Sequence, residues 1–88
     1  MEKISVNTQL LSDLINEAIL LLLHAKEGEA NQCLNNVFDE LLRLSSSFDP
    51  DTLSNLSQIM PIMLDAQQRR DHVYLVDILK YELPKHIS

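Results

Sequence analysis

Four side chains in this sequence have the chemistry to bind a soft metal ion: His24, Cys33, His72 and His86. Zinc sites in proteins pair such ligands at short spacings, such as two cysteines three residues apart or two histidines four apart on one helix face. No two of these four residues are spaced in that way. His24 follows the most apolar stretch, where a helix dipole favours a histidine at the helix end. We therefore expect no metal site and no cofactor.

Nucleophilic catalysis would need a cysteine or serine beside a positioned base. Cys33 lies on an apolar helical stripe, and no lysine or arginine is close to it in sequence to lower its pKa. A buried structural thiol is the better interpretation. The serines at 45–47 have the composition of a loop, so the sequence predicts no nucleophile.

Acidic pairs are the remaining source of acid–base chemistry. Asp13 and Glu17 share one face of the first predicted helix, and Glu27 and Glu29 lie close together after it. In a chain this acidic, solvated helix faces explain both pairs. A di-iron bundle would need a glutamate followed three residues later by a histidine in two helices, and the sequence has no such pair. It also lacks a glycine-rich phosphate loop, so we predict no catalytic residues and no enzyme.

Composition indicates one small helical domain covering residues 1–88. The 88 residues include one glycine and three prolines, and such a shortage of turn residues favours long helices over a β-rich fold. The net charge of −6 repels phosphate backbones and anionic lipid, so neither nucleic acid nor membrane is an expected partner. The single cysteine excludes an internal disulfide and agrees with a reducing compartment.

The most hydrophobic run spans residues 18–23, far short of the ~20 apolar residues that a membrane-spanning helix needs. The chain has neither the basic start nor the small-residue cleavage site of a signal peptide. We therefore expect a cytoplasmic protein.

The two halves of the chain echo each other at an offset of 42 residues, most clearly where Leu11-Ser12 recurs as Leu53-Ser54. Together with the periodicity of the apolar residues, this echo predicts two helical hairpins forming an all-α bundle of four antiparallel helices. The predicted helices span about 7–26, 30–45, 50–68 and 72–83. The echo is also compatible with a duplication, although identity between the halves is low.

Local signals define the ends of these helices. Asn7, Asp49 and Asp71 are suited to be N-caps, and Pro50 suits the first helical position. Gly28 is the expected left-handed stop of the first helix. Pro61 should kink the third helix without breaking it, and Pro84 should close the fourth.

The first predicted helix has more apolar surface than three neighbours can easily cover. From residue 18 to residue 25, seven of the eight positions are apolar, whereas a bundle helix needs about three in seven. Ile19, Leu20 and Leu23 are the candidate self-association face, and a homodimer is the expected assembly. The alternative is that this helix is central and flanked by the other three.

A second candidate surface lies around the turn before the fourth helix. Tyrosine and arginine are the residue types that anchor protein interfaces, and they gather here with a histidine: Arg69, Arg70, His72, Tyr74 and Tyr81. The alternative interpretation is that the tyrosines cover the edge of the core while the arginines solubilise a turn.

Residues 71–83 (DHVYLVDILKYEL), preceded by Ala66-Gln67-Gln68, resemble the C-terminal signature of small uncharacterised helical proteins of Firmicutes-type bacteria. That resemblance implies a helical fold and no particular activity. The same segment, with residues 28–30 of the first half, also resembles the helical hairpin of tetratricopeptide repeats. The 42-residue offset exceeds the usual 34-residue repeat, and the Trp/Gly/Tyr pattern is missing.

The functional prediction is a non-enzymatic protein–protein interaction module: an adaptor, a regulator or an export-chaperone-like binder of another protein's helix. The alternative is a structural or assembly subunit whose surplus apolar face serves only its own oligomer. A third possibility is a small enzyme or ligand carrier that uses the bundle interior.

Overall fold

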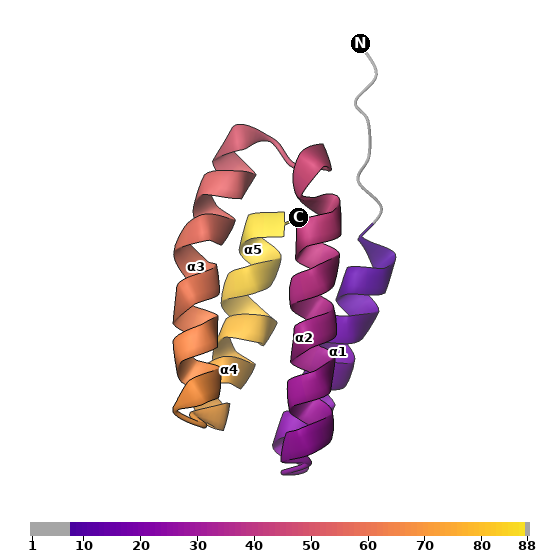
Figure 1. Ribbon diagram of the computed structural model, residues 1–88, viewed down its shortest axis with the longest axis vertical. Helices are drawn as coiled ribbons and strands as arrows, with labels where there is room; N and C mark the ends of the chain where they lie inside the picture. Colours follow the sequence, from indigo (N-terminus) through magenta and orange to yellow (C-terminus); the bar gives the residue numbers. More distant parts are fainter. Residues whose placement is uncertain (1–7, 88) are drawn as a thin grey trace.

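The computed structural model describes residues 8–87, which fold into four antiparallel helical segments (Figure 1). The all-α prediction is confirmed, and the described residues contain no strand. The elements are α1 (Gln9–Leu23), α2 (Glu27–Leu44), the 3-10 turn η1 (Ser45–Ser47), α3 (Pro50–Gln68), α4 (His72–Asp77), the π-helical turn η2 (Ile78–Glu82) and α5 (Leu83–Ile87). The segments α4, η2 and α5 follow one another without a break and act as the fourth helix.

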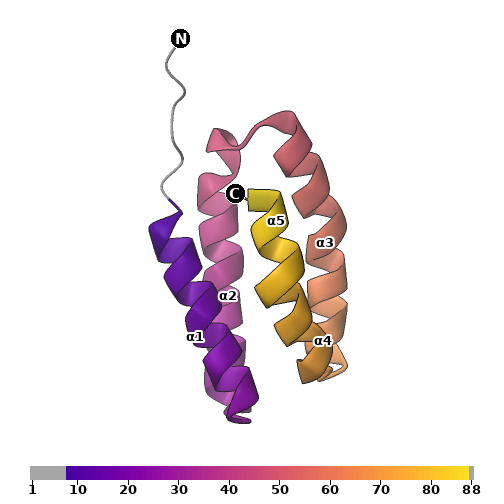
Figure 2. The same cartoon turned by 180° about the vertical axis from the view of Figure 1, so that it is seen from behind.

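Two hairpins make up the bundle. α1 packs along α2, and α3 packs along the fourth helix, while α4 and η2 also lie beside α1 (Figure 2). The core between them is aliphatic, because each helix turns a stripe of leucine, isoleucine, valine or alanine inward. Its fully covered side chains include Leu11, Leu34, Leu41, Met63, Leu75, Ile78, Leu79 and Leu83.

Both described N-cap predictions in the second hairpin are confirmed. The Asp49 carboxylate accepts a hydrogen bond of 2.7 Å from the Thr52 amide, and Pro50 occupies the first position of α3. The Asp71 carboxylate accepts one of 3.2 Å from the Tyr74 amide. Each bond satisfies an amide that the first helical turn leaves without a partner. The third predicted cap, Asn7, lies outside the described residues.

Gly28 does not end the first helix, so that prediction is wrong. It lies in the first turn of α2, and the left-handed residue is Ala25, with φ 57°. The Ala25 amide donates to the Leu22 carbonyl at 3.1 Å and the Lys26 amide to the Leu21 carbonyl at 2.9 Å. These two bonds form a Schellman motif, in which Ala25 takes the left-handed position that glycine usually occupies.

The second hairpin turn repeats this motif. Arg70 has φ 57°, its amide donates to the Gln67 carbonyl at 3.2 Å, and the Asp71 amide donates to the Ala66 carbonyl at 2.9 Å. The two hairpins therefore share the same turn geometry. The two turns are nevertheless further apart in sequence than the 42-residue echo, because α3 has 19 residues and α1 has 15.

The fourth helix does not end at Pro84, as the sequence predicted, but continues to Ile87. The Leu83 amide donates to the Ile78 carbonyl, five residues back, which widens the helix into a π turn just before the proline. Proline lacks an amide proton and its ring clashes with the carbonyl four residues earlier. A wider turn at that place accommodates the ring, so the helix passes through Pro84. In the third helix, α3 likewise passes through Pro61 without interruption.

Candidate interaction surface

The candidate self-association residues differ in their exposure. Leu20 and Leu23 are 58% and 63% exposed, whereas Ile19 is half-buried and packs against the core. Leu20 lies two residues from both Ala18 and Leu22, which are buried, and two residues correspond to about 200° around a helix. The side chain of Leu20 therefore points away from the bundle.

A fourth apolar side chain lies at the same end of the molecule. The Arg70 Nε lies 2.9 Å from the Glu27 Oε1, and this ion pair joins the first residue of α2 to the turn before α4. Val73 follows Arg70 by less than one helical turn and is 76% exposed. We call Ile19, Leu20, Leu23 and Val73 the end patch, because α1 ends and α4 begins at this end of the molecule (Figure 2).

The arginines of the second candidate surface are engaged with carboxylates of the same chain. Arg69 Nε lies 2.8 Å from Asp65 Oδ2, and Arg70 pairs with Glu27. His72 is half-buried at the start of α4. Both arginines therefore already pair with a carboxylate of the same chain. Their side chains nevertheless remain more than half exposed.

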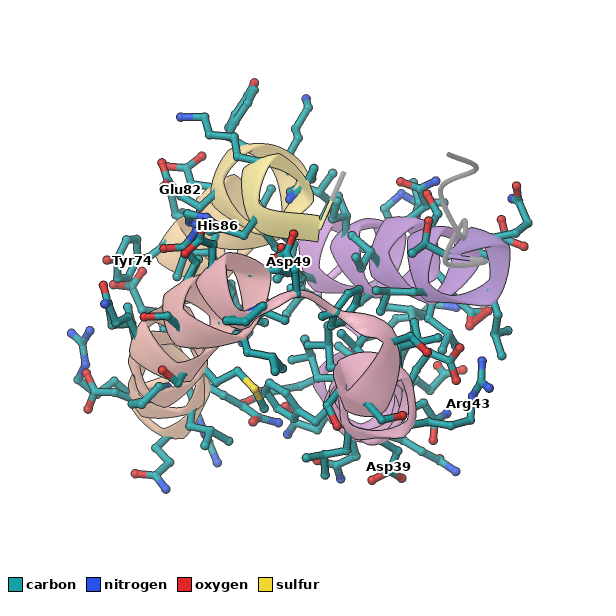
Figure 3. The ribbon with its side chains drawn as sticks, turned by 90° about the horizontal axis from the view of Figure 1, so that it is seen from above. Asp39, Arg43, Asp49, Tyr74, Glu82 and His86 are labelled. Atoms are coloured by element: carbon teal, nitrogen blue, oxygen red, sulfur yellow. The ribbon has the colours of Figure 1, made fainter. Side chains whose placement is uncertain are left out.

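The two tyrosines of that surface, Tyr74 and Tyr81, are 42% and 56% exposed. In a regular α-helix, a spacing of seven residues would place them on one face. Tyr81, however, lies within the π turn Ile78–Glu82, whose wider winding departs from the α-helical spacing. Tyr81 is therefore turned away from the line of Tyr74, with the Lys80 ammonium 5.5 Å from the centre of its ring. Figure 3 shows Tyr74 instead on the side of the molecule where Glu82 and His86 lie.

Two shallow depressions lie between helices, and the sequence predicted neither. One, of about 170 Å³, runs between α3 and the end of the fourth helix and is lined by Asn55, Gln58, Ile59, Ile62, Glu82 and His86. The other, of about 210 Å³, runs between α1 and α2 and is lined by Glu17, Leu21, Glu29, Gln32, Cys33 and Asn36. Each combines residues from two helices, so only the helix pairing brings the lining residues together.

Cys33 lines the second depression and is only 4% exposed. Its thiol donates to the Leu14 carbonyl at 3.3 Å and lies 3.7 Å from the Glu17 Oε2. Burial raises the pKa of the Cys33 thiol to about 11, and the negative charge of Glu17 adds to the shift. The thiol is therefore protonated at neutral pH, which is the state of a structural cysteine and not of a nucleophile.

Among the residues that the structure describes, Glu40 is the buried acid, at 6% exposure. Both its oxygens accept from Arg43, Oε1 from Nε at 2.8 Å and Oε2 from Nη2 at 2.6 Å. This bidentate hydrogen bonding lowers the pKa of Glu40, so the carboxylate is held ionised. A general acid would need the opposite shift.

In the part of the chain that the structure describes, no three histidine, cysteine or acidic side chains lie close enough together to hold a metal ion. None of the helices within residues 8–87 is long and apolar enough to cross a membrane. No family model, no curated protein and no solved structure matches the chain.

Proposed function

We propose that this protein is a non-enzymatic protein–protein interaction module that binds a helix of another protein through apolar side chains of α1. It would act as an adaptor, a regulator or a chaperone-like helix binder. The proposal places it in the cytoplasm, in keeping with its single cysteine and acidic charge.

The observation that supports this function is the exposure of Leu20 and Leu23, at 58% and 63%, in the most apolar part of the chain. Full burial of a leucine is worth ~1.5–3 kcal/mol, so two leucines left more than half in water forgo a useful part of that energy. A partner helix that covers them with its own apolar side chains would recover it, as in other complexes where a helix fills an apolar surface.

Two features support a role without catalysis. The Cys33 thiol is protonated because burial raises its pKa to about 11, and the Glu40 carboxylate is fully engaged with Arg43. Both groups stabilise the fold in ways that leave them unsuited to proton or group transfer.

The alternative function is that of an assembly subunit, in which the end patch meets a second copy of the chain. It is favoured by the run Ile19–Leu23, which contains no charged residue. A two-fold contact centred on this run would bring together apolar side chains without opposing like charges. A homodimer is the simplest such assembly.

The experiment compares the wild-type protein with Leu20→Glu and a matched control, Leu42→Glu. Leu42 is 64% exposed and lies near the other end of the bundle, on α2. Light scattering after size exclusion gives the mass of the assembly, and a hydrophobic dye reports the apolar surface that remains exposed.

An interaction module should bind the dye in its native state, and Leu20→Glu should reduce that binding more than Leu42→Glu does. An assembly subunit should run as one discrete oligomer with little dye binding, and Leu20→Glu should convert it to a soluble monomer. If Leu20→Glu changes neither the dye signal nor the mass, the end patch has no binding role and the proposal fails.

A further inference from the structure

The depression between α1 and α2 has a chemical character of its own. Its lining includes two carboxylates, Glu17 and Glu29, two side-chain amides, Gln32 and Asn36, and no cation. Leu21 and Cys33 supply its apolar part. A concave surface with apolar and anionic side chains is suited to a partner that is both apolar and cationic.

This surface continues along the outer side of α1. Asp13 lies one turn before Glu17, and Leu20 lies one turn after it, so the three share a face. Leu10, 53% exposed, precedes Glu17 by two turns on the same side. We call Leu10, Asp13, Glu17, Leu20, Leu21 and Glu29 the acidic groove.

The carboxylates of the acidic groove are not neutralised by cations of the described chain. Asp13 accepts a hydrogen bond of 3.0 Å from the Gln9 amide, and Glu17 is the neighbour of the Cys33 thiol. None of the ion pairs between described residues involves Asp13, Glu17 or Glu29.

Four cations of the described residues are instead engaged with other carboxylates. Arg43 pairs with Glu40, Arg69 with Asp65, Arg70 with Glu27 and Lys85 with Glu82. Lys26, at the start of α2, is the cation nearest in sequence to Glu29, but it forms no ion pair with a described residue and does not line the depression, so negative charge predominates along this face.

We infer that the acidic groove binds a basic amphipathic helix of a partner protein. Leucine-like side chains of that helix would cover Leu10, Leu20 and Leu21, and its lysines or arginines would reach Asp13, Glu17 and Glu29. The groove between two antiparallel helices is a natural seat for a third helix. A second copy of this chain fits less well, because it would bring more carboxylates to a surface that is already anionic.

This inference rests on the proposed function and names the class of its partner. Its test uses three synthetic helical peptides with identical leucine positions and polar faces of lysine, glutamine or glutamate. Each is titrated with the protein by fluorescence anisotropy, at low and at high salt. If the acidic groove is the binding site, the lysine peptide should bind most tightly, and added salt should lower its affinity more than that of the other two peptides.

Matched charge variants locate the binding site. Glu17→Gln with Glu29→Gln should weaken the lysine peptide roughly three- to tenfold, the range expected for two ion pairs at the edge of an interface. Asp51→Asn with Asp77→Asn removes the same charge from exposed positions on α3 and α4 and should leave the affinity within about twofold. Circular dichroism confirms that each variant is folded.

The outcomes separate the two proposals. If the three peptides bind equally, or if the control pair weakens binding as much as the groove pair, the acidic groove does not select a basic helix, while helix binding itself stands. If no peptide binds, the proposed function fails and this inference fails with it.

Discussion

Two residues other than glycine adopt the left-handed backbone conformation in the described part of this protein. Ala25 and Arg70 take φ 57°, a conformation that is about 1–2 kcal/mol less favourable for an ordinary residue than a right-handed one. At each turn two backbone hydrogen bonds to the preceding helix offset the strain. Gly28, which has the needed freedom, lies inside α2 and does not use it.

Exchanging the residue types at these positions should therefore stabilise the protein. Gly28→Ala should raise the free energy of unfolding by up to about 1 kcal/mol, because alanine is the better helix former and nothing lies within 4 Å of an added Cβ. Ala25→Gly should also raise it, by relieving the left-handed strain. Urea denaturation measures both. A loss of stability in Gly28→Ala would mean that Gly28, not Ala25, is the left-handed residue.

Cys33 should be chemically silent in the folded protein. Burial raises the pKa of its thiol to about 11, and only the thiolate reacts with a disulfide reagent. At pH 8 we expect no reaction with Ellman's reagent on a timescale of minutes, and full reaction of one thiol per chain in denaturant. Rapid reaction of the native protein would show that the contact of α1 with α2 opens readily at Glu17.

Glu40 should make the stability depend on acid pH. Its hydrogen bonds to Arg43 lower the pKa of the carboxyl in the folded state, so the stabilisation is fully present above the unfolded pKa. It is then lost as the pH falls through about 4.5 towards the lower folded pKa. Glu40→Gln should accordingly reduce the difference in unfolding free energy between pH 6 and pH 3. An unchanged difference would show that Arg43 does not hold the charge.

At the scale of an element, the π turn decides which side chains of the fourth helix meet the core. Leu75, Ile78 and Leu79 define the buried side, and a regular helix would place position 82 on that side and Leu83 at its margin. The widened turn instead leaves the Glu82 side chain 51% exposed and buries Leu83 completely. It therefore spares the core an acid that would have to be desolvated.

Two neighbouring substitutions test this register. Leu83→Ala should lower the free energy of unfolding by about 2–5 kcal/mol, as for other fully buried leucines. Glu82→Ala should change it by about 0.5 kcal/mol or less, because it removes only an exposed side chain and a 3.8 Å pairing with Lys85. Thermal denaturation followed by circular dichroism measures both. Equal effects would contradict the π turn.

At the scale of the whole molecule, the apolar surface exceeds what four short helices cover. Besides the end patch, Leu10, Leu42 and Tyr81 are each more than half exposed. A domain of this size has a small stability margin, so any contact that covers such surface adds noticeably to it. This imbalance connects the fold to the proposed function.

Self-association through that surface should make stability depend on concentration. If the end patch joins two chains, the Tm of the wild-type protein should rise with protein concentration, because binding favours the folded state by mass action. In Leu20→Glu the Tm should be independent of concentration. A Tm independent of concentration in the wild-type protein would assign the end patch to a different partner and exclude the homodimer.

Local features of the sequence predict much of this fold. The scarcity of glycine and proline, the period of the apolar residues and the caps Asp49 and Asp71 act within a few residues of the chain. They therefore favour four main helices before any packing between the helices is considered. The sequence also suggested Ile19, Leu20 and Leu23 as a self-association face, because a helix that is apolar on most sides has more apolar surface than its neighbours can cover.

Tertiary packing decided the rest. Whether Ile19 or Leu20 is covered depends on where α4 lies against α1, and the acidic groove exists only because α2 places Glu29 beside the face that bears Glu17. The π turn likewise reflects a choice between burying Glu82 and burying Leu83, which arises only against a packed core. These outcomes depend on contacts between segments far apart in the chain, and residue spacing within one helix carries no information about its neighbours.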